Sequence, residues 1–292
     1  MRLRKKTLVL AIIVIIIAVV PITSVGVGDM MFRSQVEQEI ENMFASSGNI
    51  SDKIFTHEQL NGLPEPVQRY LQYSLEEGQS YISYVRLKHG GTIRQSAEQE
   101  WMPVSGEEYF TAQRPGFVWV AKASFFPLFW LAAKDSYLVG KGDFQIKLLS
   151  LITVADAMGK ETDEGELMRW LAETVWFPTA LLPSEHLRWE AIDSNSAKAI
   201  LTSDGFEVNV TFVFNEKGEI TQLIGNRYRA TEGGSYQMQR WLGYYRDYEQ
   251  IHGGSVRIPQ EIEVAWGDSQ AVEFSYARFR ITDIEFNNPT KY

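Results

Sequence analysis

A basic start followed by a long uncharged segment constrains this chain more than any other sequence feature. Four basic residues, Arg2, Arg4, Lys5 and Lys6, precede Thr7–Gly28, which holds 22 residues without a charged or histidine side chain. A membrane-spanning helix needs about 20 such residues, and flanking basic residues favour the cytoplasmic side. The sequence therefore predicts a single transmembrane helix in the cytoplasmic membrane, with a cytoplasmic N-terminus and an extracytoplasmic remainder.

A cleaved secretory signal is the alternative interpretation of residues 1–28. Its apolar core is typically about 7–15 residues long, and the most apolar stretch here, Leu8–Val20, has thirteen residues. Small residues at Ser24, Gly26 and Gly28 suit a peptidase, but no Ala-x-Ala motif follows the core. We favour a retained anchor.

The composition excludes several classes of site and partner. The chain has no cysteine, which excludes disulfides, thiolate metal sites and a lipid-modified cysteine. After residue 28 the remaining 264 residues carry 24 Lys and Arg against 37 Asp and Glu, a balance of −13. Nucleic-acid-binding proteins show basic patches. No nucleic-acid partner is therefore predicted.

The hydrophobic pattern divides the chain into three regions. These are the anchor at 1–28, a juxtamembrane stalk at 29–62 and an extracytoplasmic β-rich domain at 63–292. Ser34–Phe44, in the stalk, has the apolar spacing of a helix. Leu63–Leu75 is predicted to be a short helix that begins with prolines, which a first helical turn tolerates.

From Ser80 onward the apolar period becomes two, which is typical of β-strands. The first predicted strands are Tyr81–Ile93, Ala97–Met102, Glu108–Ala112, Phe117–Ala123 and a strand pair or one bent strand within Ser136–Leu149. After Leu187 they are Phe206–Phe214, Glu219–Ala230, Gln237–Gln250, Ser255–Trp266 and Ala271–Phe286. The first two of these later strands form a predicted hairpin.

One helix interrupts the strands. Thr162 or Asp163 can cap its N-terminus, and Leu167, Trp170 and Leu171 share one face. Because helices do not alternate with strands, a parallel sheet is disfavoured. The predicted fold class is α+β, mainly antiparallel β: a curved sheet or incomplete barrel with a mid-chain helix, preceded by the transmembrane helix.

The most apolar stretch outside the anchor is Ala123–Ala133. Pro127 interrupts it, which argues against a regular central strand. It can fill the core at a sheet corner. Alternatively, it forms a flap over an apolar cavity or a surface that dips into the outer leaflet, since a large exposed apolar patch usually has such a use.

Arginines near the C-terminus and on the mid-chain helix are candidates for a polar site. Arg227 and Arg229 share one strand face, where they pair with glutamates or recognise an acidic headgroup at a cavity mouth. Arg169 and Glu173 are four residues apart on the helix. If that helix is covered on both faces, this pair is buried and matters more than an exposed one.

Sequence signals for catalysis are weak. The four histidines have no partner at ligand spacing, and no G-x-S-x-G, G-x-G-x-x-G or P-loop pattern is present. Carboxylates are abundant, but no pair stands out. An enzyme is therefore less favoured than a binding domain, and no catalytic residue, cofactor or metal is predicted.

Arg169–Ala180 has the pattern R-x-L-x-E-x-x-W-x-P-x-A. With Asp135–Gly142 and Arg257–Ile262, it resembles a prokaryotic family of membrane-anchored proteins of unknown function, from about Leu63 to Phe286. The resemblance implies no activity. The pattern of strands, with one mid-chain helix, is also similar to the lipoprotein-carrier fold, which implies a curved, incomplete barrel around an apolar cavity. A retained anchor departs from a shuttling carrier and favours a tethered binder.

The favoured function is a membrane-tethered domain that binds a hydrophobic or lipid-like ligand in an apolar cavity. One alternative is an envelope protein-interaction or structural domain without a cavity, and another is a carboxylate-based envelope hydrolase. The candidate cavity residues are Trp119, Phe125, Phe126, Phe129, Trp130, Arg169, Trp170, Glu173, Trp176, Arg227 and Arg229.

Overall fold

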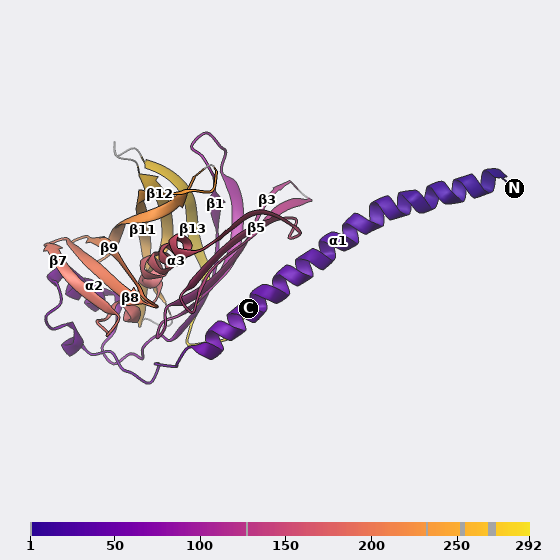
Figure 1. Cartoon of the computed structure of the whole chain (residues 1–292). Helices are drawn as coiled ribbons and strands as arrows, with labels where there is room; N and C mark the ends of the chain where they lie inside the picture. The colour runs from indigo at the N-terminus through magenta and orange to yellow at the C-terminus, as the bar shows by residue number, and fades with distance from the viewer. Residues whose placement is uncertain (1, 127, 232, 252–254, 268–272) are drawn as a thin grey trace.

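The computed structural model describes residues 2–126, 128–231, 233–251, 255–267 and 273–292, with side chains from Thr23 onward. These residues form three α-helices and thirteen β-strands. All thirteen strands belong to one open, curved antiparallel sheet, and helix α1 (Arg2–Ser46) projects away from it (Figure 1). The predicted antiparallel β fold is confirmed.

Two meanders make up the sheet, and each follows chain order. The first contains β1 (Tyr84–Ile93), β2 (Met102–Thr111), β3 (Gly116–Phe126), β4 (Phe129–Leu138), β5 (Lys141–Leu148) and β6 (Ile152–Met158). The second contains β7 (Leu187–Asp193), β8 (Ser196–Ser203), β9 (Phe206–Phe214), β10 (Ile220–Ala230), β11 (Tyr236–Ile251), β12 (Val256–Gly267) and β13 (Glu273–Phe286). Because β1 pairs with β13, strands β6 and β7 lie at opposite edges.

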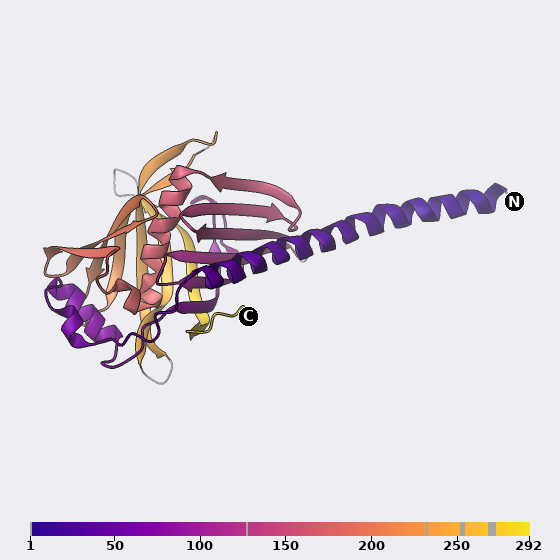
Figure 2. The same ribbon diagram turned by 60° about the horizontal axis from the view of Figure 1, so that its bottom comes forward.

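Helix α3 (Lys160–Glu173) leads from one edge of the sheet toward the other. It contacts β3 to β6 of the first meander and β9 and β10 of the second. Figure 2 shows it lying inside the curve of the sheet. The sheet surrounds the helix, so its charged residues Glu166 and Glu173 are buried together with Leu167 and Trp170.

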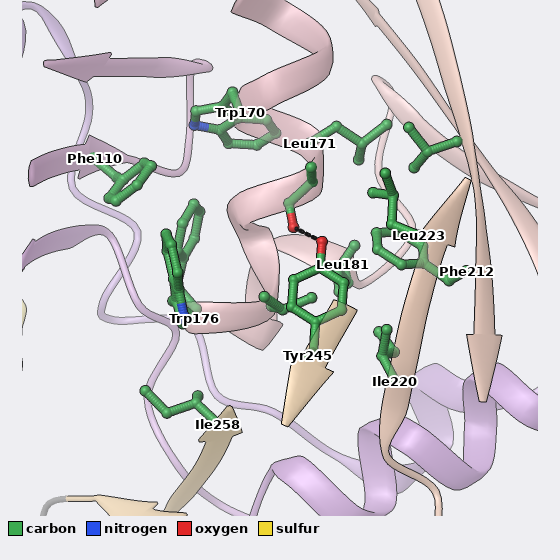
Figure 3. Close-up of a cluster of buried hydrophobic side chains, with 14 of the residues drawn as sticks. Phe110, Trp170, Leu171, Trp176, Leu181, Phe212, Ile220, Leu223, Tyr245 and Ile258 are labelled. Carbon is green, nitrogen blue, oxygen red and sulfur yellow. Dashed lines mark hydrogen bonds between the residues drawn. The ribbon is translucent and has the colours of Figure 1, made fainter. Parts of the chain in front are cut away.

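The main core packs against the concave face of the sheet, and Figure 3 shows part of it. After α3, the short helices η2 (Thr174–Trp176) and η3 (Pro178–Leu181) bring Trp176 and Leu181 beneath the sheet. The Trp176 ring lies 6.1 Å from that of Phe110, and the Tyr245 hydroxyl donates to the Ala172 carbonyl at 2.9 Å. Aromatic contacts of this kind add to the burial of apolar area.

Helix α2 (Glu65–Ser74) contacts β8 and β12 at the edge of the main core. Val67, Tyr70 and Leu71 are completely buried, and the short helix predicted within Leu63–Leu75 is confirmed. Phe55 and Leu60, from the predicted stalk at 29–62, are buried in the same core. The stalk therefore contributes side chains to the folded domain.

A second, smaller core lies on the outer face of the sheet. The C-terminal part of α1 contributes Phe32, Val36, Ile40, Met43 and Phe44, which pack against Tyr84, Tyr109, Val118 and Ala132. Below them Lys134 is 1% exposed and donates to Glu39 Oε1 at 2.8 Å and Asp143 Oδ2 at 2.6 Å. These carboxylates compensate for the burial of the ammonium group.

Several predicted elements are confirmed, and one strand is wrong. The hairpin of β9 and β10 and the strands β11 and β12 form as predicted. Residues 97–101, predicted as strand, lie between β1 and β2, and β2 begins at Met102 and runs through Gly106, whereas the prediction began this strand at Glu108. A Cβ on Gly106 would lie 2.6 Å from the Val120 carbonyl oxygen, so this glycine allows close backbone approach.

The predicted Thr162 or Asp163 cap is also corrected. α3 begins at Lys160, and its N-cap position is Gly159. Asp163 instead accepts hydrogen bonds from the Gly142 backbone at 2.8 Å and from Lys141 at 2.8 Å. Its carboxylate connects the helix to β5.

For the predicted anchor at 1–28, the structure describes side chains only from Thr23 onward. The backbone of residues 2–28 is helical and continues into the rest of α1. Within the part of the chain that the structure describes, no helix is both long enough and apolar enough to span a bilayer. The transmembrane segment at 1–28 therefore stays a prediction.

Replacing the buried ammonium is expected to loosen α1 from the sheet. Lys134→Met leaves Glu39 and Asp143 without their cation, which should cost roughly 2–3 kcal/mol because both acids keep some access to water. Hydrogen–deuterium exchange of the full chain in detergent should show faster exchange across residues 29–46. Lys122→Met, on the same outer face but exposed, is the control, and equal exchange in both variants contradicts the prediction.

Candidate functional site

A cavity of about 960 Å³ lies between α3 and the concave face of the sheet. Its sheet walls are mainly apolar and include Ala121, Ala133, Ile146, Val264 and Phe279. The helix presents a polar side, with Glu166, Arg169 and Glu173 among the lining residues. Ligand pockets commonly measure about 300–1,000 Å³ and combine apolar walls with a few placed polar groups. This cavity has both properties.

Arg169 is the centre of the polar side. Its guanidinium donates to Glu173 Oε1 at 2.9 Å, Asp135 Oδ2 at 2.6 Å and Glu108 Oε1 at 2.7 Å. Glu108 comes from β2 and Asp135 from β4, so one side chain joins α3 to two strands. The guanidinium carbon also lies 4.8 Å from the centre of the Phe117 ring, a cation–π distance.

A second arginine binds the helix from the opposite meander. Arg227, on β10, donates to Glu166 Oε1 at 2.8 Å and to the Gly165 carbonyl at 3.0 Å. Its guanidinium carbon is 5.0 Å from the centre of the Trp241 ring. A Cβ on Gly165 would lie 3.2 Å from Arg227 Nε, so a small residue here lets the arginine approach the helix.

The buried carboxyl groups hold protons more tightly than exposed ones. Burial, together with the nearby Asp135 carboxylate, raises the pKa of Glu166 to about 8, although Arg227 favours the charged form. Burial and the neighbouring Glu173 carboxylate raise the pKa of Glu108 well above its ordinary value. Burial also raises the pKa of Glu173. Low access to water and like charges nearby both favour the protonated form of Glu108, Glu166 and Glu173.

A neutral histidine lies beside this cluster. The Trp119 indole donates to His89 Nε2 at 2.7 Å, which requires that nitrogen to be unprotonated. Burial and the charge of Arg169 lower the pKa of His89 to about 3. His89 therefore adds no positive charge to the cluster near neutral pH.

Comparison with known proteins identifies a family. The model of a family of unknown function, DUF6544, matches residues 53–279. This chain belongs to that family. The match confirms the resemblance to a family without an assigned activity, while the twelve-residue motif and membrane anchoring stay predictions.

The other comparisons add little to the DUF6544 assignment. No curated protein matches the chain. Among solved structures, a porin-like protein from Bacteroides uniformis ATCC 8492 is 12% identical, with 70% of this chain and 96% of that chain covered. Its TM-score is 0.26, so the likeness carries no argument.

Six of the predicted site residues of this DUF6544 protein line the cavity. They are Trp119, Phe125, Arg169, Glu173, Arg227 and Arg229. Arg227 and Arg229 share the inward face of β10, as the strand period predicts, and Arg229 donates to Gln239 at 3.2 Å. Their role in binding stays a prediction.

The other five predicted residues lie elsewhere. Trp170 and Trp176 are buried in the main core. Phe126 is 67% exposed and Phe129 is 47% exposed at the end of the β3–β4 hairpin. Trp130 faces the outer side, where its indole donates to Ser150 at 3.1 Å. In this DUF6544 chain the apolar segment 123–133 therefore forms a hairpin whose end is exposed.

Sequence reasoning missed three acids of the site. Glu108, Asp135 and Glu166 contact the two arginines, although none was singled out. The strand period contained a usable signal. Glu108 lies two residues before Phe110, and Asp135 lies two residues before Tyr137, so each acid shares the inward face of its strand with a buried ring. Within the described ranges, no three His, Asp or Glu residues are arranged to ligate a metal ion.

The raised pKa of Glu166 predicts a specific pH dependence of stability. The folded state binds an extra proton between the unfolded pKa, near 4.5, and the folded pKa of about 8, so the free energy of unfolding falls as pH rises through this window. Glu166→Gln mimics the protonated acid and should remove a slope of roughly 1 kcal/mol per pH unit.

Chemical unfolding of the full chain at several pH values measures this slope. Glu164→Gln, the same change on the same helix outside the cavity lining, is the matched control. His89 contributes an opposite slope between about pH 3 and 6.5 in both variants, so the difference between them isolates Glu166. A slope unchanged by Glu166→Gln contradicts the prediction.

Proposed function

We propose that this protein is a membrane-tethered, extracytoplasmic domain that holds a hydrophobic or lipid-like ligand in the cavity between α3 and the sheet. The observation that supports this proposal most directly is the cavity of about 960 Å³ with mainly apolar sheet walls. The rest of the concave face is filled by Phe110, Trp176, Phe212 and their neighbours. An apolar space of this size beside a well-packed core suits a ligand, because protein interiors otherwise leave few large voids.

The end of the domain near the predicted anchor supports a location beside the bilayer. As a helix, Thr7–Gly28 would be about 33 Å long, close to the thickness of the hydrocarbon core of about 30 Å. Just after it, Asp29 accepts a hydrogen bond from Ser150 at 2.8 Å. The turn between β5 and β6 therefore lies level with the end of the uncharged segment.

Exposed apolar side chains gather at this same end. Leu151 is 45% exposed, Phe126 67% and Leu128 77%. The bond from Trp130 to Ser150 joins the β3–β4 hairpin to the turn beside α1, and Figure 2 shows these strand ends pointing along α1 toward its N-terminal half. These residues suit contact with the outer leaflet, and Phe125 extends the apolar lining from the cavity toward them.

A second candidate function is protein interaction through the edge strand β6. Among the described strands it pairs only with β5, and its Ile152, Val154 and Met158 are each more than half exposed. An exposed edge strand of this kind can accept a further strand from another chain. This function needs no cavity, so filling the cavity distinguishes the two candidates.

Filling the cavity is expected to expel the ligand. Ala133 lies on the inward face of β4 and lines the cavity, so Ala133→Trp occupies ligand space. Native mass spectrometry of the full chain released from detergent should show a copurified amphiphile, reduced at least tenfold in this variant. Ser105→Trp, exposed on the outer face of β2, is the control. A ligand-free unmodified chain, or equal occupancy in both variants, contradicts the proposal.

A further inference from the structure

The polar side of the cavity contains more acidic than basic groups. The acids Glu108, Asp135, Glu166 and Glu173 face the bases Arg169 and Arg227. The other titratable groups that line the cavity are Arg94, Glu100, Glu161, Tyr228, Arg229, Tyr236, Tyr245 and Tyr276, and His89 on β1 lies near Arg169. His89 is neutral, because its Nε2 accepts the Trp119 hydrogen bond. Full ionisation of the four acids would therefore leave two uncompensated negative charges beside the cavity.

Three carboxylate oxygens in this cluster have no donor once the acids are ionised. Asp135 Oδ1, Glu166 Oε2 and Glu173 Oε2 are buried and accept no hydrogen bond from an N–H group or hydroxyl of the described residues. Glu166 with Asp135, and Glu108 with Glu173, are close enough to share a carboxyl proton. Asp135, Glu166 and Glu173 line the cavity and are more than nine-tenths buried, and a buried charged acceptor without a donor costs free energy. When the shared protons are lost, the cluster therefore lacks both positive charge and hydrogen-bond donors.

We infer that this cluster binds a cationic headgroup, so that the ligand is an amphiphile with an ammonium group at one end and an apolar chain along the sheet walls. The inference rests on the proposed function and specifies its ligand class. An ammonium supplies the two missing features, since it carries positive charge and three donors.

An acidic headgroup, the interpretation offered by the arginine pattern, fits this cluster less well. Arg227 is already bound to Glu166 and to the Gly165 carbonyl. Arg169 is bound to three carboxylates. An anion here would face four acids, and separating either arginine from its partner would leave a buried carboxylate unpaired. The other arginines in the cavity lining are Arg229, which donates to Gln239, and Arg94, which donates to the Ser275 and Ala97 carbonyls.

Cation binding and proton release are coupled in this arrangement. In the unliganded cluster, protons neutralise part of the negative charge, and burial with the nearby Asp135 holds the pKa of Glu166 at about 8. A bound ammonium replaces such protons. Its affinity should therefore rise with pH below 8, by up to tenfold per pH unit for each proton released.

Three probes with the same twelve-carbon chain test this inference on the full chain. Dodecylamine carries the cation, and its ammonium, like that of lysine, titrates only near pH 10. Dodecanol is neutral and dodecanoate is anionic. Native mass spectrometry after equilibration of the detergent-solubilised protein at pH 6, 7 and 8 measures occupancy by each. We expect dodecylamine to bind at least tenfold more tightly than dodecanol at pH 8, with a smaller preference at pH 6.

Two charge-removing variants locate the site. Glu166→Gln and Asp135→Asn should each weaken dodecylamine binding roughly tenfold or more, the effect of losing a hydrogen bond to a charged group. Dodecanol binding should be unchanged. Glu164→Gln, on the same helix but not lining the cavity, is the matched control. The pH dependence in the unmodified chain needs no variant, so the test stands even if one variant fails to fold.

The outcomes separate the ligand class from the proposed function. Equal binding of all three probes, or tightest binding of dodecanoate, overturns the cationic headgroup while leaving an apolar ligand in place. A preference for dodecylamine that is independent of pH and of both variants also overturns it. Failure of all three probes to bind overturns the inference together with the proposed function.

Discussion

The position of α3 inside the curved sheet is the constraint on which the rest of the structure depends. The two edge strands are far apart, so the chain from β6 to β7 crosses the concave face as a helix. A helix surrounded by strands has no solvent-facing side for Glu166, Arg169 and Glu173. Glu173 pairs with Arg169 on the same helix, and the sheet supplies Glu108 and Asp135 for Arg169 and Arg227 for Glu166, from both meanders. The ion pairs both attach the helix and place polar groups at one wall of the cavity.

The cavity is asymmetric as a consequence. Aromatic and aliphatic side chains from the sheet provide its apolar walls, whereas α3 provides Glu166, Arg169 and Glu173, and β4 adds Asp135. Apolar burial gives affinity without orientation, and placed polar groups determine which end of a ligand enters first. Large buried rings such as Phe110 and Phe212 fill the remaining concave face. A rigid core at one end and an open apolar space at the other fit a binding domain better than a solid structural one.

Much of the fold was predictable from local patterns. The strand Phe206–Phe214, its hairpin with the following strand and the short helix α2 each appear as predicted, because one side of these elements is buried and the other is not. Prediction failed where the pattern depended on distant neighbours. In β2, Val120 and His89 approach Gly106 so closely that a larger residue would not fit there. In the sequence alone, such a glycine resembles the end of a strand. Trp170 and Trp176 matched a cavity wall in composition, yet they pack in the core.

The sequence by itself determined the antiparallel strands, the mid-chain helix, the absence of disulfides and the pairing of Arg169 with Glu173, since each follows from residues near one another in the chain. The tertiary structure alone decided that this pair is buried and joined by Glu108 and Asp135, which lie 61 and 34 residues from Arg169. It also decided that Arg227 forms an ion pair with Glu166. Electrostatic partners are selected by distance in space and by exclusion of water, and neither quantity is encoded in the spacing along one strand or helix.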